Sequence, residues 1–177
     1  MMTPTQSTNG PLWSGTLAGA TVLGSFALAC VFPFAAIAAL AALTLGRRSA
    51  MMLVGVAWAA NQSVGFFLLS FPWDAQAVGH GIAILGATYC GFEAARFAAL
   101  SVGNNPFARG GAALLAAFIV YEVLLLAYAQ VGGGAENFSA EIVAQIAIND
   151  ALWFAGLMVL RIAITQATGA SALPQDA

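Results

Sequence analysis

The sequence predicts an all-α integral membrane protein, folded as a compact bundle of six transmembrane helices. Of its 177 residues, 61% are hydrophobic and only 7% are charged. A water-soluble domain needs roughly a quarter of its surface residues charged. Half of the twelve charged residues lie outside the long apolar runs, and lipid is the expected solvent for most of the surface.

Six apolar runs account for most of the chain, and a helix needs about 20 apolar residues to cross a bilayer. Phe32 and Pro33 separate the first two runs, and proline disfavours helix both at its own position and just before it. A break is therefore expected there, and one long kinked helix, giving five in all, is the alternative. The runs are residues 12–31, 34–45, 50–69, 75–100, 111–131 and 138–167.

The predicted domain organisation is a single transmembrane domain over residues 12–168. A cytoplasmic tail at 1–11 precedes it, and a flexible tail at 169–177 follows it. The first tail has no basic residue, so it lacks the positive region of a secretory signal.

Arginine sets the expected orientation, because the chain contains no lysine. Arg47 and Arg48 lie between the second and third runs, and Arg109 lies between the fourth and fifth. The alternate loops carry Asp74 and Glu136 instead. The positive-inside rule places the arginines in the cytoplasm, and six helices then put both termini there. The predicted location is the bacterial inner membrane, as a multi-pass protein.

Polar side chains inside the apolar runs point to a binding site, because such groups usually face a bundle interior or a cavity. In the sixth run Glu141, Gln145 and Asn149 are spaced four apart and share one helical face. This stripe predicts one wall of a pocket open to the outside. The candidate substrate-binding residues are Asn61, Gln62, Trp73, Asp74, His80, Tyr121, Tyr128, Glu141, Gln145 and Asn149.

Several candidates also have a purely structural interpretation. Asn61 and Gln62 can serve as hydrogen-bonding links between helices. Trp73 fits the aromatic belt found at membrane interfaces. A lone histidine such as His80 is often a buried side chain with its hydrogen bonds satisfied. Both interpretations stay open from the sequence alone.

Six charged residues lie within the runs themselves: Glu93, Arg96, Glu122, Glu141, Asp150 and Arg161. Glu93 and Arg96 are spaced to pair along one face of a helix, near the predicted inner interface. Glu122 and Asp150 have no such partner nearby in the sequence. An unpaired carboxylate at mid-depth is costly, so a structural interpretation accounts for these two less easily.

Motifs of soluble enzymes and nucleic-acid binders do not occur in the sequence. The chain has one histidine and no G-x-S-x-G or P-loop motif, so histidine-paired metal sites and these catalytic arrangements are excluded. With a net charge of −2 and no basic cluster, no nucleic-acid partner is expected. We expect neither an enzyme nor a resident cofactor or metal.

Small residues along the first run form a candidate partner-docking face, made of Gly15, Gly19, Ala20 and Gly24. Small residues at four-residue spacing let two helices approach closely. Such a face serves packing within the chain equally well, so both interpretations are kept.

The architecture of the whole chain resembles the substrate-binding S-components of energy-coupling-factor vitamin transporters. The resemblance implies a vitamin site between the outer loops and the last three helices. It also implies a first helix that docks a coupling subunit working with ATPases. The family docks through an Ala-xxx-Ala face, and the nearest match is Ala20-xxx-Gly24.

Within that family, the stretch from Trp58 to Phe66, WAANQSVGF, followed by Phe71-Pro72-Trp73, is similar to proteobacterial members linked to cobalamin. Those members use a loop cysteine as a cobalt ligand, which this sequence lacks at that place. The resemblance therefore implies His80 as a possible axial ligand for the cobalt of a bound corrinoid.

The expected function is a membrane-embedded solute-binding and uptake subunit with a vitamin-like substrate, cobalamin or a related corrinoid first. One alternative is a small membrane scaffold or assembly protein without transport. The other is an ion or metal permease that uses Glu122, Asp150 and His80.

Overall fold

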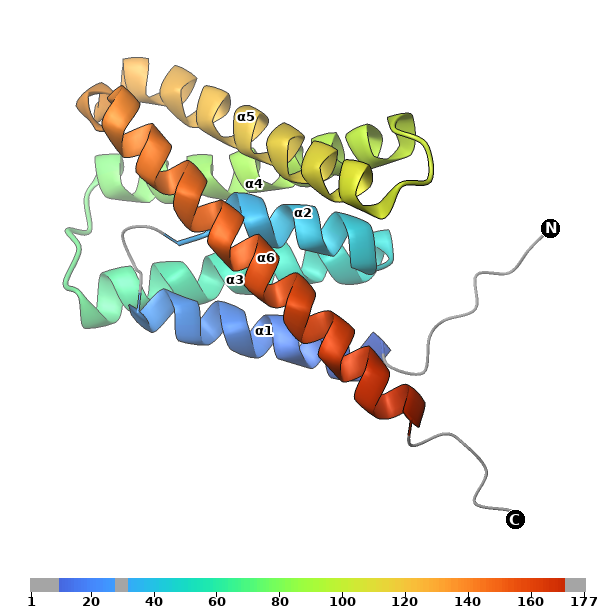
Figure 1. The fold of residues 1–177 in the computed structure, drawn as a ribbon. Coiled ribbons are helices and arrows are strands. Elements are labelled where there is room, and N and C mark those ends of the chain that lie inside the picture. Colours follow the sequence, from blue (N-terminus) through green and yellow to red (C-terminus); the bar gives the residue numbers. More distant parts are fainter. Residues whose placement is uncertain (1–9, 28–31, 171–177) are drawn as a thin grey trace, which may run out of the picture.

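The computed structural model describes residues 10–27 and 32–170. In this part of the chain the fold is all-helical, with six α-helices and no strand (Figure 1). The helices are α1 (Gly10–Ala27), α2 (Phe34–Thr44), α3 (Arg47–Ser63), α4 (Ala75–Ser101), α5 (Pro106–Gly132) and α6 (Ala140–Ala170). A π-helical turn, η1 (Val64–Leu68), extends α3, and a 3-10 turn, η2 (Ala135–Phe138), precedes α6.

The predicted break at the proline is confirmed, and the alternative of one long kinked helix is wrong. α1 ends at Ala27, and α2 begins at Phe34, directly after Pro33. The predicted domain bounds of 12 and 168 each lie two residues inside the helices, which begin at Gly10 and end at Ala170. The outer parts of both predicted tails, 1–9 and 171–177, lie outside the described residues.

α2 is the centre of the bundle. Every residue from Phe34 to Ala41 is buried, and the helix packs on α3, α4, α5 and α6. Five of these eight residues are alanines, whose small side chains let four helices pack close to its axis. At 1.5 Å per residue α2 is only about 17 Å long, roughly half the thickness of a bilayer core. Its N-terminus therefore lies inside the bundle.

α4 and α5 form a long antiparallel pair, the most extensive interface between helices (Figure 1). Asn105 begins α5 by accepting hydrogen bonds from the backbone N–H groups of Phe107 and Ala108, at 2.9 and 3.2 Å. Pro106 takes the first helical position, where a missing N–H costs nothing. At Gly91 the backbones of the two helices come into direct contact.

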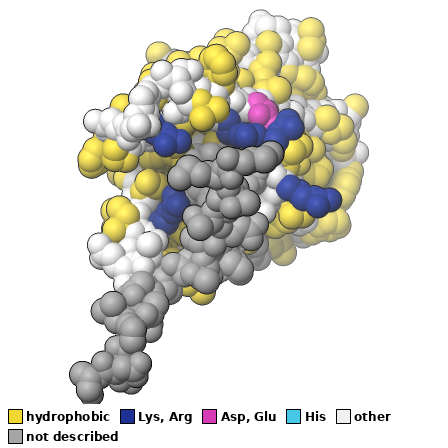
Figure 2. All heavy atoms as spheres, turned by 90° about the vertical axis from the view of Figure 1, so that its right-hand side faces the viewer, with side chains coloured by type: hydrophobic (Ala, Val, Ile, Leu, Met, Phe, Trp, Pro, Cys, Tyr) yellow, Lys and Arg dark blue, Asp and Glu magenta, His cyan; other side chains and the backbone are white. Residues whose placement is uncertain are grey.

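The arginines gather at one end of the bundle, here called the arginine end (Figure 2). This end holds the turn between α2 and α3, the turn between α4 and α5, and the C-terminal end of α6 (Figure 1). The opposite end holds residues 69–74 and 133–139. The two ends therefore differ in charge. The arginines are Arg47, Arg48, Arg96, Arg109 and Arg161, and the acidic residues of the opposite end are Asp74, Glu136 and Glu141.

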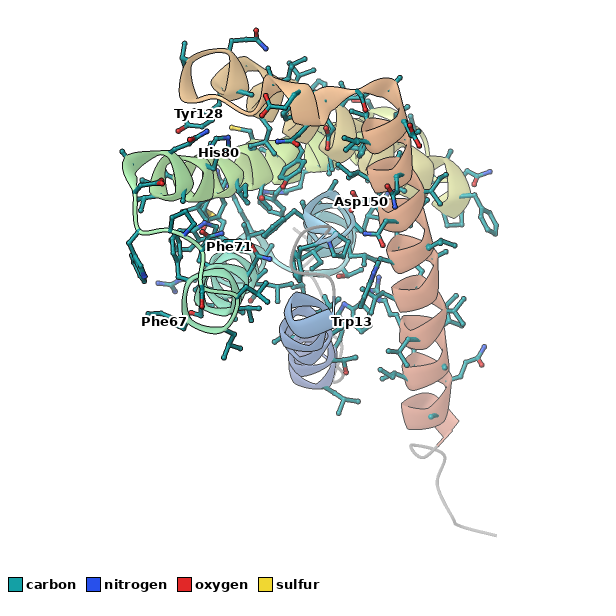
Figure 3. All side chains as sticks on the ribbon, turned by 90° about the vertical axis from the view of Figure 1, so that its left-hand side faces the viewer. Trp13, Phe67, Phe71, His80, Tyr128 and Asp150 are labelled. Carbon is teal, nitrogen blue, oxygen red and sulfur yellow. The ribbon has the colours of Figure 1, made fainter. Side chains whose placement is uncertain are left out.

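α6 crosses the other helices obliquely and packs mainly on α2 (Figure 1). Near its C-terminal end it meets α1 through Trp13, whose ring lies toward α6 (Figure 3). The Arg161 guanidinium carbon stands 5.8 Å from the centre of that ring. The buried Trp13 also donates from Nε1 to Thr44 Oγ1 at 2.9 Å. One tryptophan thus joins α1, α2 and α6.

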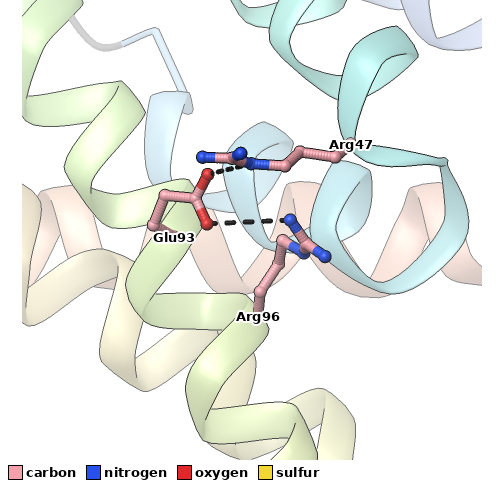
Figure 4. Close-up of polar contacts among 3 residues, drawn as sticks. All are labelled: Arg47, Glu93 and Arg96. Atoms are coloured by element: carbon pink, nitrogen blue, oxygen red, sulfur yellow. Dashed lines mark hydrogen bonds and ion pairs between the residues drawn. The ribbon is translucent and has the colours of Figure 1, made fainter.

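The predicted pairing of Glu93 with Arg96 is confirmed, and Arg47 joins it (Figure 4). Arg47 Nε lies 2.7 Å from Glu93 Oε1, and Arg96 Nη1 lies 3.7 Å from Glu93 Oε2. These side chains are 35 to 62% exposed, and exposed ion pairs contribute at most about 1 kcal/mol. The group links α3 to α4 at the arginine end without dominating stability.

Three of the described helical segments have both the length and the apolar composition to cross a membrane: Arg47–Leu68, Pro106–Gly132 and Ala140–Ala167. α2 is apolar but shorter. Large apolar side chains cover the outside of the bundle, as expected of a surface that meets lipid rather than water. They include Phe97, Leu100, Leu115, Ile119, Val123, Leu152, Val159 and Ile162.

Candidate functional site

The segment before α4 ends with two predicted site residues, Trp73 and Asp74, that have structural roles in the fold. Asp74 Oδ1 accepts from the Ala77 N–H at 2.8 Å, so Asp74 is the N-cap of α4. Trp73 is 68% exposed, and its ring stacks on Phe66 with centroids 4.3 Å apart. Phe67 meets the same ring edge-on at 5.6 Å. This exposed aromatic group matches the interfacial-belt interpretation of Trp73.

His80 and Tyr128 meet at the end of the bundle opposite the arginines (Figure 3). Their rings pack edge to face, with centroids 5.0 Å apart. His80 Nδ1 lies 2.9 Å from the carbonyl oxygen of Gln76. A carbonyl oxygen can only accept a hydrogen bond, so Nδ1 carries the hydrogen in this contact. In the neutral ring, Nε2 then keeps its lone pair.

A glycine loop covers His80 from the side of α5. Gly133 and Gly134 have φ of 84° and 92°, a region that other residues rarely adopt. A Cβ at Gly134 would lie 3.2 Å from His80 Nε2 and 3.4 Å from Asn137 Nδ2. A Cβ at Gly133 would lie 2.7 Å from the Gln76 amide nitrogen.

We call this group the loop site: Gln76, His80, Tyr128, Gly134 and Asn137. It offers an imidazole lone pair, a phenol hydroxyl and two side-chain amides within one small region. The sequence-based site contained His80 and Tyr128 but missed Gln76 and Asn137. The signal that was available is the run of three glycines, which permits the close approach of the loop.

Gly134→Ala is expected to distort the loop site. An alanine at φ 92° is strained by roughly 1–2 kcal/mol, and its Cβ would press on the His80 ring. Hydrogen–deuterium exchange should therefore show faster exchange at residues 133–138 than in the wild-type chain. Gly111→Ala is the matched control, because nothing lies within 4 Å of its added Cβ. Unchanged exchange in Gly134→Ala would contradict the described loop.

Asn61 and Gln62 lie elsewhere, in the contact between α3 and α4. Gln62 Nε2 donates to Asn61 Oδ1 at 3.2 Å, and the Gln62 side chain lies against Gly81 of α4. Trp58 Nε1 donates to the Gly81 carbonyl oxygen at 2.6 Å. In this structure these polar groups link α3 to α4, which matches the interpretation of Asn61 and Gln62 as hydrogen-bonding links between helices.

The centre of the bundle holds the buried Tyr121 and the two buried carboxylates, Glu122 and Asp150. Asp150 Oδ1 accepts from the Ala36 N–H of α2 at 2.8 Å. Tyr121 stacks on Phe34 with ring centroids 6.0 Å apart. Glu122 is 8% exposed, and its Oε2 has no hydrogen-bond partner among the described residues.

The residues of the polar stripe on α6 differ in exposure along the helix. Glu141 and Gln145 are exposed, whereas Asn149 is half-buried and lines a cavity of about 380 Å³. The cavity continues from Asn149 toward the arginine end, not toward the opposite end. The other described lining residues are Leu152, Trp153, Gly156, Leu157 and Leu160.

A second cavity, of about 160 Å³, lies between α5 and α6 and reaches Asp150. The structure thus distributes the ten predicted residues among the segment before α4, the loop site, the α3–α4 contact, the bundle centre and α6, rather than around one pocket. No group of three or more histidine, cysteine or acidic side chains suited to a metal ion occurs in the described part of the chain.

The small-residue face of α1 is open at two of its four positions. A Cβ added at Gly15 or Gly19 would meet nothing within 4 Å. Ala20 packs against the apolar core. The surroundings of Gly24 lie outside the described side chains.

No protein-family model matches the chain. Searches of curated proteins and of solved structures gave no match either.

Proposed function

We propose that the chain is a membrane-embedded solute-binding subunit of a bacterial uptake system. In this proposal all six helices lie in the inner membrane, and the arginine end faces the cytoplasm together with both termini. The loop site then lies at the outer end, where a solute arrives. The charge difference between the two ends of the bundle supports this orientation.

The single observation that carries the proposal is the way His80 is held. Its Nδ1–H is fixed by the Gln76 carbonyl, so the Nε2 lone pair is presented to the loop at Gly134. Histidines that bind metals commonly donate their other N–H to a carbonyl in this way. Such a nitrogen suits either a hydrogen-bond donor on a solute or the cobalt of a corrinoid substrate.

The expected substrate is vitamin-like, and the loop site favours a polar one. Tyr128, Gln76 and Asn137 can exchange hydrogen bonds with it, and the exposed aromatic rings before α4 can cover an apolar part. Neither described cavity is lined by a residue of the loop site, so in this proposal the loop at residues 133–139 moves outward to admit a corrinoid. A small vitamin needs less movement.

The open face of α1 is the proposed docking surface for a partner protein. Gly15 and Gly19 provide a flat helix surface on which a coupling subunit, linked to ATPases, can dock closely. The same surface meets lipid when no partner is present.

Uptake of labelled vitamins by bacterial cells that produce the chain tests the proposal. We expect His80→Ala and Tyr128→Phe to lower uptake of the accepted vitamin about tenfold, the effect of losing one hydrogen bond of about 1.4 kcal/mol. Tyr89→Phe is the matched control, because the Tyr89 hydroxyl donates to the Met51 carbonyl, away from the loop site. Equal effects of Tyr128→Phe and Tyr89→Phe would contradict a solute site at the loop.

A membrane scaffold without transport is the second candidate. It is favoured by the bond from Trp58 to Gly81 and by the pair of Asn61 and Gln62, which use polar groups for packing. Cells producing a scaffold would accumulate none of the vitamins.

A further inference from the structure

Three helices meet where α2 begins. Ala36 of α2 donates its backbone N–H to Asp150 of α6, from which it is separated by 114 residues in the chain. Tyr121 of α5 stacks on Phe34, the first residue of α2. The middle parts of α5 and α6 therefore lie at the same helix end, inside the bundle.

Asp150 completes this helix end. The first N–H groups of a helix have no partner within the helix, and together they carry a partial positive charge. Pro33, the residue before α2, offers no side-chain acceptor. Asp150, only 1% exposed, supplies one. The helix end therefore favours Asp150 as an ionised carboxylate.

The surroundings of Glu122, unlike those of Asp150, disfavour the ionised carboxylate. It shares a face of α5 with Leu114 and Phe118, which together with Asp150 line the 160 Å³ cavity. This face directs Glu122 toward α6, within electrostatic range of Asp150. The side chain is more than nine-tenths buried, and its Oε2 lacks a partner among the described residues. Burying an ionised carboxylate in this way is costly, whereas the neutral acid avoids most of that cost.

We propose that Glu122 and Asp150 form a proton-binding site at the N-terminus of α2. Glu122 holds the proton, and Asp150 carries the charge that caps the helix. Two carboxylates within electrostatic range of each other in a medium of low polarity bind one proton more readily than both ionise.

Few other ionisable groups face this pair. α2 contributes no titratable side chain, and α5 adds the Tyr121 hydroxyl. Along α6 the nearest charged groups are Glu141 and Arg161, each more than two turns from Asp150. η2 adds Glu136 at the end of the bundle, and the described part of α1 has no charged residue. The proton is therefore exchanged between Glu122, Asp150 and whatever enters the cavity between α5 and α6.

Protonation of this site affects how firmly α6 is held in the bundle. α6 is held mainly against α2, and the hydrogen bond from the Ala36 N–H to Asp150 joins these two helices. Uptake of a second proton by Asp150 neutralises its carboxylate and weakens this bond. We expect α6 to be freer in that state.

Infrared spectroscopy of the whole chain in lipid nanodiscs tests the site. At neutral pH we expect the C=O stretch of a protonated carboxylic acid, shifting only slowly in D₂O because the group is buried. Carbon-13 labelling of the glutamates should move the band, and Glu122→Gln should remove it. Glu141→Gln, which changes an exposed glutamate on α6, should leave it unchanged.

Absence of the band at neutral pH would overturn the proposal, as would a band that persists in Glu122→Gln or ignores the glutamate label. The label needs no substitution, so the test holds even if Glu122→Gln does not fold. No solute takes part in the measurement. A failed proton site and a failed solute site are therefore separate results.

Discussion

Gly91→Leu is expected to lower the free energy of unfolding by about 3 kcal/mol, because it forces α4 and α5 apart. A Cβ at Gly91 would lie 3.0 Å from the Ala117 carbonyl oxygen and 3.6 Å from its Cα. These are backbone atoms, which cannot turn aside as a side chain can. A leucine must therefore displace one helix along the most extensive interface of the bundle. Denaturant unfolding in a constant detergent measures the change.

Gly86→Leu is the matched control for this substitution. It makes the same change on the same helix, but a Cβ at Gly86 meets nothing within 4 Å. Since leucine favours helix over glycine by up to about 1 kcal/mol, this variant should be as stable as the wild-type chain or slightly more so. Similar losses in the two variants would show that α4 and α5 do not meet at Gly91.

Asp150→Leu is expected to lower the free energy of unfolding by about 2 kcal/mol. The substitution removes the acceptor of the Ala36 N–H and leaves that donor buried without a partner. It also removes the negative charge from the N-terminus of α2. Asp150→Asn keeps an acceptor oxygen at the same place, so its loss should be smaller, about 1 kcal/mol.

Thermal unfolding of these variants beside Glu141→Leu checks the expectation. Glu141 is exposed on the same helix, so its replacement should change stability by no more than about 0.5 kcal/mol. If Asp150→Leu matched Glu141→Leu, the cap of α2 would not contribute to the fold. If Asp150→Asn matched Asp150→Leu, the contribution would come from charge rather than from the acceptor.

The helices were largely predictable, because each apolar run ends at residues that stop a helix or begin one. Pro33 separates α1 from α2, and Asp74 and Asn105 cap the helices that follow them. The pairing of Glu93 with Arg96 followed from spacing along one helix. These features depend on residues close together in the chain.

The arrangement of the helices was less predictable. α2 is an apolar run like the others, and nothing in its periodicity distinguishes a helix enclosed by protein from one that meets lipid. Its central position depends on contacts with four other helices. The partner of Asp150 is likewise separated from it by 114 residues, a distance that local patterns do not cover.

The candidate site was also predictable only where it depends on residues close together in the chain. The four-residue spacing of Glu141, Gln145 and Asn149 correctly placed them along one side of α6, but only Asn149 lines a described cavity. His80 was a candidate because a histidine in an apolar run is unusual. Its contact with Gly134 depends on two positive φ angles, which the glycines permit but do not specify.

Equilibrium binding of a vitamin panel, including cobalamin and cobinamide, to the purified chain tests whether it is a solute-binding subunit. Trp73, three residues before Gln76 of the loop site, and the other tryptophans allow binding to be followed by fluorescence. We expect saturable, submicromolar binding of one compound, lost in His80→Ala and kept in Tyr89→Phe. Folded protein that binds no compound in the panel would contradict the claim of a solute-binding subunit. Binding that is unchanged in His80→Ala would contradict the loop site.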